Sequence, residues 1–217
     1  MRYLSTIEAS EILNISSNQI RYLIRNNRLV AKKDKAKGKE HILHIIDINR
    51  FKNLDDMYNK QENNNPDILW IYEACKYIMY LMKLDSYIPE QIIAVAHGGL
   101  VLASIIASTL RIPVENIKIS YYDDNKERLE NPLIIKNLPD TIPNIPTLIV
   151  DDILETGTTI NIVKSELINR GVDEVNIKVA VLHKKPLGES SIKPDWYAYL
   201  AEDWITYPWE PKETTNE

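Results

Sequence analysis

The sequence has a single cysteine and no long apolar run, and both shortages exclude classes of protein. Cys75 has no second cysteine to pair with, so an internal disulfide is excluded and nothing indicates an oxidising compartment. The first residues lack the apolar core of a signal peptide, and no stretch approaches the length of a membrane-spanning helix. We therefore expect a cytoplasmic protein. Its 217 residues suit one large domain or a small domain joined to a medium one.

The net charge of −5 is unevenly distributed along the chain. Residues 1–53 contain 11 basic and 5 acidic residues, a net charge of +6. The remaining residues contain 15 basic and 26 acidic residues, a net charge of −11. This split predicts two units with different partners, and a polyanion is the partner expected of the basic one. The alternative is a chance cluster of solvated lysines between Lys32 and Lys39.

Two short helices are predicted near the N-terminus. Ser5 and Glu8 form a capping-box pattern that opens a helix over residues 7–13, and Ser17 is placed to cap a second helix over residues 18–27. In a helix-turn-helix, the second helix enters the major groove of DNA. The polar face of this second helix carries the residues expected to contact DNA, namely Asn18, Gln19, Arg21, Tyr22 and Arg25.

Two strand-like segments over residues 29–33 and 41–46 follow, and they predict a basic β-wing whose Lys32 and Lys33 also contact DNA. A closing helix is expected over residues 47–51. The pattern resembles the excisionase and MerR type of winged helix-turn-helix domain over residues 1–53, through Tyr3–Ala9, Ile20–Arg25 and Asp47–Phe51. The resemblance implies DNA binding, although the same small fold can dock proteins or mediate oligomerisation.

A polar stretch over residues 54–66 reads as a linker, although Leu54–Asn59 can extend the preceding helix. Beyond it, strands and helices alternate over residues 67–211, which predicts an α/β domain with a parallel sheet and helices on both sides. Residues 212–217 form a tail. We expect helices over residues 67–83, 100–110 and 160–170, and strands over residues 92–96, 117–122, 133–135, 147–150 and 175–182.

The most informative stretch covers residues 147–159. An apolar strand ends in Asp151 and Asp152, and a small loop of Thr156, Gly157, Thr158 and Thr159 then opens a helix. The carboxylates can hold ribose hydroxyls or a metal, and the loop amides and hydroxyls can surround a phosphate at a helix N-terminus. Gly98 and Gly99 follow another strand, and the carboxyl ends of parallel strands share one edge of a sheet. We therefore expect the two loops to converge.

Separated motifs in this half of the chain resemble type I phosphoribosyltransferases, the xanthine-guanine branch in particular. Val150–Thr159 resembles the signature for phosphoribosyl diphosphate. The other matching segments are Ile93–Val101 for the pyrophosphate loop, Ile119–Arg128 for the start of the catalytic loop, Lys185 and Pro186 for the purine contact, and Asp203–Glu210 for the C-terminal hood. The resemblance spans about residues 67–211 and implies a parallel-sheet phosphoribosyltransferase fold.

The resemblance also implies a reaction, transfer of ribose 5-phosphate from phosphoribosyl diphosphate to a 6-oxopurine with Mg²⁺. Glu155 would handle the purine proton, Arg128 would close over the site from a mobile loop, and Lys185 would donate to the 6-oxo group. The remaining roles fall to His97, Gly98 and Gly99 at the pyrophosphate, Asp151 and the Thr156–Thr159 loop at the phosphosugar, Asp152 and Glu210 at the metal, and Trp204 and Ile205 at the base. A homodimer or homotetramer is implied as well.

Three positions depart from the family pattern and leave two function classes open. His97 stands where Arg or Lys is usual, and Glu155 and Glu210 stand where Asp is usual. The chain is either an active purine phosphoribosyltransferase with a DNA-binding module, or a transcription regulator that senses phosphoribosyl diphosphate or purine nucleotides without turnover. The acid retained at position 155 favours the enzyme. His183 and Lys184 are expected at the surface or at a strand edge.

Overall fold

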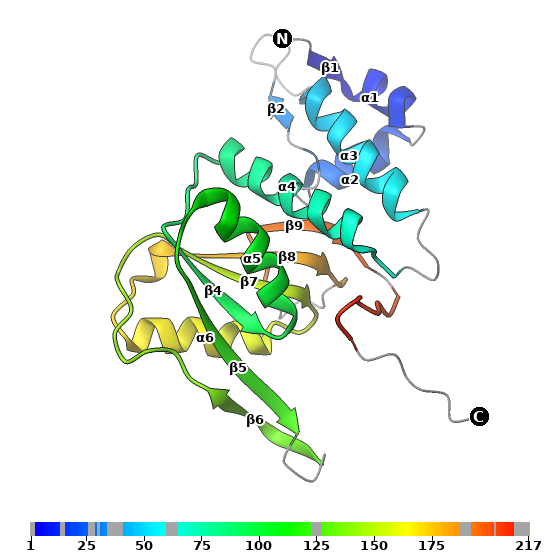
Figure 1. Cartoon of the computed structure of the whole chain (residues 1–217). Coiled ribbons are helices and arrows are strands. Elements are labelled where there is room, and N and C mark those ends of the chain that lie inside the picture. Colours follow the sequence, from blue (N-terminus) through cyan, green and yellow to red (C-terminus); the bar gives the residue numbers. More distant parts are fainter. Residues whose placement is uncertain are drawn as a thin grey trace, which may run out of the picture. The chain divides into compact units, whose positions relative to one another are not determined.

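The chain forms two compact units in the computed structural model, which describes residues 3–13, 16–25, 29, 31–33, 41–59, 65–122, 127–186, 192–201 and 203–210 (Figure 1). One unit contains residues 1–77 together with 205–210, and residues 78–204 make up the other. Within the described part of the chain, no helix is long and apolar enough to cross a lipid bilayer. The predicted domain limits of 1–53, 54–66 and 67–211 stay a prediction, and the tail over 212–217 lies outside the described residues.

The first unit begins with a small antiparallel sheet and three helices. The sheet has the strand order β1-β3-β2. Strand β1 was not predicted, whereas the order of the other helices and strands agrees with the sequence prediction. The assignment as a DNA-binding winged helix stays a prediction. The elements are β1 (Tyr3–Ser5), α1 (Thr6–Leu13), α2 (Ser17–Arg25), β2 (Ala31–Lys33), β3 (His41–His44) and α3 (Ile45–Tyr58).

Capping boxes start both of the first two helices. Ser5 N–H donates to Glu8 Oε2 at 2.8 Å, and Glu8 N–H donates back to Ser5 Oγ at 3.2 Å, which confirms the first predicted cap. Helix α2 is capped by Ser16 instead of Ser17. The reason is that Gln19, three residues after Ser16, accepts from Ser16 N–H at 2.8 Å and donates its own N–H to Ser16 Oγ.

Helix α3 is longer than predicted because its apolar face continues past residue 53. Phe51, Leu54 and Tyr58 follow the helical spacing and are all buried. The Tyr58 ring lies 5.1 Å from the ring of Trp70, whose indole N–H donates to the Leu54 carbonyl. The part of the predicted linker before residue 59 is therefore helical and packed.

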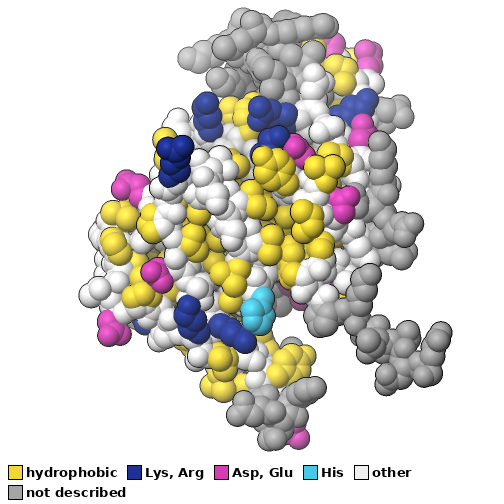
Figure 2. All heavy atoms as spheres, viewed as in Figure 1, with side chains coloured by type: hydrophobic (Ala, Val, Ile, Leu, Met, Phe, Trp, Pro, Cys, Tyr) yellow, Lys and Arg dark blue, Asp and Glu magenta, His cyan; other side chains and the backbone are white. Residues whose placement is uncertain are grey.

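Helix α4 (Ile68–Leu84) contains the boundary between the two units. Near its start it buries Trp70 and exposes Ile68, Leu69 and Tyr72, and Figure 2 shows hydrophobic side chains gathered over this helix. A Lys76–Glu73 ion pair follows on the next turn. The start of α4 thus has one packed side and one apolar side that faces solvent.

The second unit is built on a six-stranded sheet with the order β6-β5-β4-β7-β8-β9. The β5–β6 pair is antiparallel and the other pairs are parallel, so the predicted parallel sheet is correct apart from β6. Strand β9 was not predicted, because it is short and follows a polar segment. The elements are β4 (Gln91–Ala96), α5 (Gly98–Leu110), β5 (Val114–Tyr122), β6 (Arg128–Lys136), β7 (Thr147–Leu154), α6 (Thr158–Asn169), η2 (Glu174–Asn176), β8 (Ile177–Lys184) and β9 (Trp196–Leu200).

Helices α5 and α6 cover opposite faces of this sheet (Figure 1). Ile160, Val163 and Leu167 of α6 pack in one apolar cluster with alternate residues of the central strands, such as Ile93 and Ile149. The chain extends the sheet in one direction from β4 to β5 and in the other from β7 to β8. The order therefore reverses between β4 and β7, where sheets of this type bind ligands.

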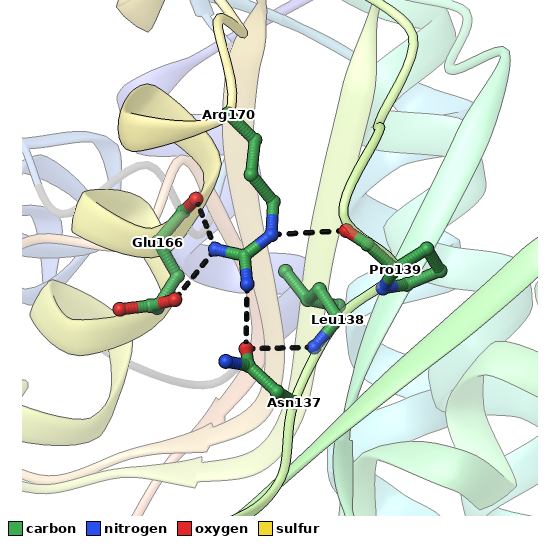
Figure 3. A network of polar contacts seen from close by, with 5 residues as sticks. All are labelled: Asn137, Leu138, Pro139, Glu166 and Arg170. Atoms are coloured by element: carbon green, nitrogen blue, oxygen red, sulfur yellow. Dashed lines mark hydrogen bonds and ion pairs between the residues drawn. The ribbon is translucent and has the colours of Figure 1, made fainter.

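Arg170, just after α6, joins that helix to the segment between β6 and β7 (Figure 3). Its guanidinium donates to the Glu166 carboxylate at 2.5 Å, to the Pro139 carbonyl at 3.0 Å and to Asn137 Oδ1 at 2.9 Å. Asn137 Oδ1 also accepts from Leu138 N–H. The Arg170 side chain is only 13% exposed, and its bond to Glu166 is partly buried, whereas the bonds to Pro139 and Asn137 lie nearer the surface.

We expect Arg170→Ala to lower the free energy of unfolding by on the order of 2 kcal/mol, because several charge-assisted hydrogen bonds are lost together. Urea unfolding of the purified protein measures this change. Lys178→Ala is the matched control, since it removes an ion pair to Asp195 whose side chains are 39% and 29% exposed. That control should cost less than about 1 kcal/mol. Equal effects of the two substitutions would contradict a structural role for the Arg170 network.

Candidate active site

The two adjacent acids lie where β7 separates from β4. Pairing between β4 and β7 ends at Ala94 and Val150, whereas pairing between β7 and β8 continues to Leu154. The predicted strand end at Val150 is therefore wrong, because β8 supports β7 for four more residues. Asp151 and Asp152 sit within β7, immediately past the last partner in β4. This is the switch point of the sheet, at the carboxyl ends of the strands.

The glycine loop after β4 lies directly against these acids, as the sequence predicts. A Cβ atom at Gly98 would collide with the Asp152 carboxylate, and one at Gly99 would collide with the Val150 carbonyl. Glycine is therefore required at both positions for the backbone to approach so closely. His97 precedes them at the start of α5 with an exposed side chain, and the Ala96–His97 peptide bond is cis.

Asp151 is the more buried of the two acids, with 8% of its surface exposed. Burial, together with the neighbouring Asp152 carboxylate, raises the pKa of Asp151 well above its usual range. The Asp152 backbone N–H donates to Asp151 Oδ1 at 2.9 Å and partly offsets this effect. The protein therefore holds a carboxylate in an unfavourable place, which is typical of a functional site.

The threonine loop ends at the N-terminus of α6. Gly157 precedes this helix with a φ of 81°, a conformation that favours glycine. Among the described residues no side chain caps the helix through a hydrogen bond at Gly157. Thr156 Oγ1 and Thr158 Oγ1 lie 3.0 Å apart, beside the first-turn amides. Hydroxyls and N–H groups in this arrangement suit a phosphate.

Three side chains that follow β7, β8 and β9 gather at one place. Lys185 Nζ lies 3.4 Å from Glu155 Oε1 and 5.4 Å from the centroid of the Trp204 ring. The Lys185 side chain is 18% exposed, whereas Trp204 is 74% exposed. An exposed indole beside a cation and a carboxylate offers a stacking surface and hydrogen-bonding groups to a flat, polar ring.

One open cleft of about 500 Å³, a volume suited to a small ligand, lies along part of these features. Of the predicted residues described so far, those that do not line it are His97, Gly98, Gly99, Asp152, Thr158 and Lys185. Of the residues predicted from sequence, it is lined by Asp151, Glu155, Thr156, Gly157, Thr159 and Trp204. It also contains residues for which the sequence analysis assigned no role, namely Tyr121, Tyr122, Ile153, Leu154 and Ile160. The signal that could have identified the tyrosines is their position at the carboxyl end of a predicted strand.

Other predicted site residues are not placed at this cleft. The Arg128 backbone begins strand β6 opposite Tyr122, so it does not lie in a loop, and its side chain is outside the described residues. Ile205 and Glu210 group with the first unit, and their predicted roles stay predictions. Within the described part of the chain, no group of three or more acidic, histidine or cysteine side chains could hold a metal ion.

His183 and Lys184 are buried, at 0% and 9% exposure, so the predicted surface location is wrong. The unpredicted strand β9 explains the error, because it pairs with β8 and makes β8 an interior strand. Lys184 Nζ lies over the Tyr197 ring at 5.4 Å, and burial together with Lys193 lowers its pKa.

Comparisons with known proteins agree with this geometry. Residues 71–214 match the model of the phosphoribosyl transferase domain. The chain belongs to the phosphoribosyltransferase family. It is 33% identical over 121 residues to a xanthine-guanine phosphoribosyltransferase of Idiomarina loihiensis, which covers 55% of this chain and 70% of that one. It is 26% identical over 182 residues to xanthine phosphoribosyltransferase 1 of Saccharomyces cerevisiae, covering 66% of this chain and 87% of that one.

A solved structure supports the same family assignment. The purine phosphoribosyltransferase of Pyrococcus horikoshii superposes with a TM-score of 0.59 at 28% identity, over 70% of this chain and 97% of that chain. The phosphoribosyltransferase fold of the second unit is thus shared with a solved relative along nearly the whole length of that relative.

We expect Asp151→Asn to raise the thermal midpoint at pH 7, by about 2–4 °C for each kcal/mol gained. The pKa of Asp151 is higher in the folded state than the value of 3.8 it has in the unfolded chain. The folded wild-type protein therefore loses stability as the pH rises above 3.8. The neutral amide avoids that loss and can still accept from Asp152 N–H. The difference should vanish below about pH 4, where the carboxyl is protonated in both states.

Calorimetric scans of wild type and variant between pH 3 and pH 8 measure the effect. Asp140→Asn removes an exposed carboxylate and serves as the control. A stabilisation by Asp151→Asn that is the same at pH 3 and pH 7 would exclude burial of charge as its cause.

Proposed function

We propose that this chain transfers ribose 5-phosphate from phosphoribosyl diphosphate to a 6-oxopurine, the reaction of a purine phosphoribosyltransferase. The observation that carries the proposal is one cleft lined by Asp151, by the threonine loop, and by Glu155 and Trp204, with Lys185 in contact with the last two. The acids and the loop suit the sugar phosphate, and the third group suits a purine. The names of the similar proteins, which specify xanthine, guanine or purine, support the same substrate class.

The phosphosugar would be held at the switch point. Amides and hydroxyls of the Thr156–Thr159 loop would bind the 5-phosphate at the N-terminus of α6. The Asp151 and Asp152 carboxylates would accept from the ribose hydroxyls. The backbone of Gly98 and Gly99, which the missing Cβ atoms leave accessible, would meet the pyrophosphate. The sugar would thereby be fixed between its two phosphate ends while its bond to pyrophosphate breaks.

The purine would lie at the Trp204 end of the cleft. The exposed indole would stack on the base, and the Lys185 ammonium would donate to the 6-oxo oxygen. Glu155 would accept the proton that the purine nitrogen loses as it bonds to the sugar. Its ion pair with Lys185 shows that both side chains already reach the same point. Arg128 would add positive charge near the pyrophosphate, and His97 would contact it. The role predicted for Ile205 at the base edge stays a prediction.

Mg²⁺ is expected with the diphosphate, and the donors present fit it. Magnesium in nucleotide sites is usually held by one or two carboxylates together with phosphate oxygens, and it needs no larger protein cluster. Asp152 offers such a carboxylate beside the glycine loop, while the role predicted for Glu210 stays a prediction. When bound, the ion would supply charge stabilisation to the departing pyrophosphate.

Purified protein should form nucleoside 5′-monophosphate from guanine, xanthine or hypoxanthine when Mg²⁺ and phosphoribosyl diphosphate are present. Glu155→Gln should lower kcat by about a hundredfold or more, because the amide cannot accept a proton, and should change ligand binding far less. Chromatographic product detection measures kcat, and calorimetry measures binding of the diphosphate.

Glu174→Gln, an exposed acid in η2, is the control. Binding of the diphosphate without any product from wild-type protein would reject the enzyme and favour a transcription regulator that senses this ligand. Equal losses in kcat and in binding for Glu155→Gln would reject its role as proton acceptor.

DNA binding by the first unit is a second proposed function, favoured by the exposed polar face of α2. Ile20 and Leu23 are buried, whereas Asn18, Gln19, Arg21 and Arg25 are exposed. Arg21 donates to Asn18 Oδ1 at 2.9 Å, and Gln19 takes part in the N-terminal cap of α2. Both arginines lie at the surface of this helix. The Tyr22, Lys32 and Lys33 side chains are outside the described residues.

We expect salt-dependent binding to a duplex DNA of mixed sequence, and a double Arg21→Ala, Arg25→Ala variant should lose affinity and reduce the salt slope by about two. Fluorescence anisotropy over a salt range of about 50 to 200 mM measures both the affinity and the salt slope. Arg111→Ala, at the end of α5, is the control. Unchanged affinity in the double variant would show that α2 does not contact DNA.

A further inference from the structure

The β5–β6 ladder is irregular at Tyr121, next to the cleft. Ser120 pairs with Leu133, whereas Tyr122 pairs with Arg128, so four residues of β6 stand opposite Tyr121 alone. The Ser120 hydroxyl donates to the Tyr122 carbonyl at 2.7 Å and accepts from Tyr122 N–H at 3.1 Å, which satisfies backbone groups around the irregularity. Such irregularities often redirect a side chain beside an active site.

The redirected side chain meets the phosphate loop. Tyr121 Oη lies 2.8 Å from Thr159 Oγ1, in a partly buried hydrogen bond between β5 and the first turn of α6. Both residues line the cleft. Tyr121 is thus the residue that joins the β5–β6 hairpin to the loop proposed to hold the 5-phosphate. The sequence places it only within the Ile119–Arg128 segment that resembles the start of the catalytic loop, without a role of its own.

We propose that Tyr121 is a positioning residue for the phosphate subsite and acts through Thr159. This inference rests on the proposed function of that loop. A phosphate dianion has only acceptor oxygens, so a bound ligand makes the Thr159 hydroxyl donate outward. The phenol of Tyr121 must then donate to Thr159 Oγ1, because a hydroxyl has a single proton. The resulting chain from Tyr121 through Thr159 to phosphate polarises the Thr159 hydroxyl and strengthens its bond to the ligand.

This hydrogen-bonded relay from Tyr121 through Thr159 to the phosphate predicts a loss of affinity that is confined to ligands carrying the sugar phosphate. Tyr121→Phe should weaken binding of ribose 5-phosphate and of phosphoribosyl diphosphate by about three- to tenfold, the range expected for one net hydrogen bond. Binding of inorganic pyrophosphate, which would occupy the glycine loop, should be unchanged. Titration calorimetry on the full chain measures all three without requiring turnover, so the result is independent of whether product forms.

A double-mutant cycle with Thr159→Val separates the relay from a direct contact. If Tyr121 acts through Thr159, adding Tyr121→Phe to Thr159→Val causes no further loss of ribose 5-phosphate affinity. Additive losses would overturn the relay, since Tyr121 would then bind the ligand by itself. Equal affinities of wild type and Tyr121→Phe would overturn it as well, as would an equal loss for pyrophosphate. Tyr72→Phe removes an exposed phenol hydroxyl from α4 and is the matched control.

Discussion

The close approach of the glycine loop to the Asp152 carboxylate is the constraint on which the rest of the site depends. Gly98 touches that carboxylate so tightly that no side chain could be placed between them. The contact exists because β4 stops pairing at Val150 while β7 continues beside β8. The strand order reverses at this point, and the loop after β4 therefore lies against the acids of β7. Both the acid pair in β7 and the threonine loop that follows this strand start from this junction.

The same junction is where function opposes stability. Two consecutive carboxylates repel each other, and Asp151 is also removed from water. A fold selected for stability alone would place a neutral or apolar residue there, as it does at Leu148 and Ile149 in the same strand. A ligand that supplies hydroxyl donors or a cation would stabilise the carboxylate pair, in line with the proposed function. Proteins commonly concentrate such unfavourable groups at active sites and offset their cost elsewhere in the core.

Much of this arrangement is predictable because it depends on local patterns. The Ser5–Glu8 cap, the alternation of strands and helices, and the convergence of Gly98 with the acids follow from spacing and from the geometry of parallel sheets. The predictions that were wrong concern pairing between strands that lie far apart in the sequence. Strand β9 buries His183 and Lys184, and β8 extends β7 past Asp152, although neither effect is visible in the local sequence. The contact of Tyr121 with Thr159, at a shift in the β5–β6 register, likewise joins segments that lie far apart in the sequence.

The base end of the cleft bears on the choice between an enzyme and a sensor. Glu155 is one methylene longer than the usual aspartate, yet its carboxylate reaches Lys185 at 3.4 Å while remaining 62% exposed. An ion pair this exposed contributes about 0–1 kcal/mol, so a purine can separate its members at little cost. In the proposed reaction, Lys185 would then turn toward the 6-oxo oxygen and Glu155 toward a ring nitrogen. An acid that changes partner when substrate arrives is what turnover needs, whereas a sensor that only binds has no use for a displaceable carboxylate. The geometry at Glu155 therefore favours the enzyme.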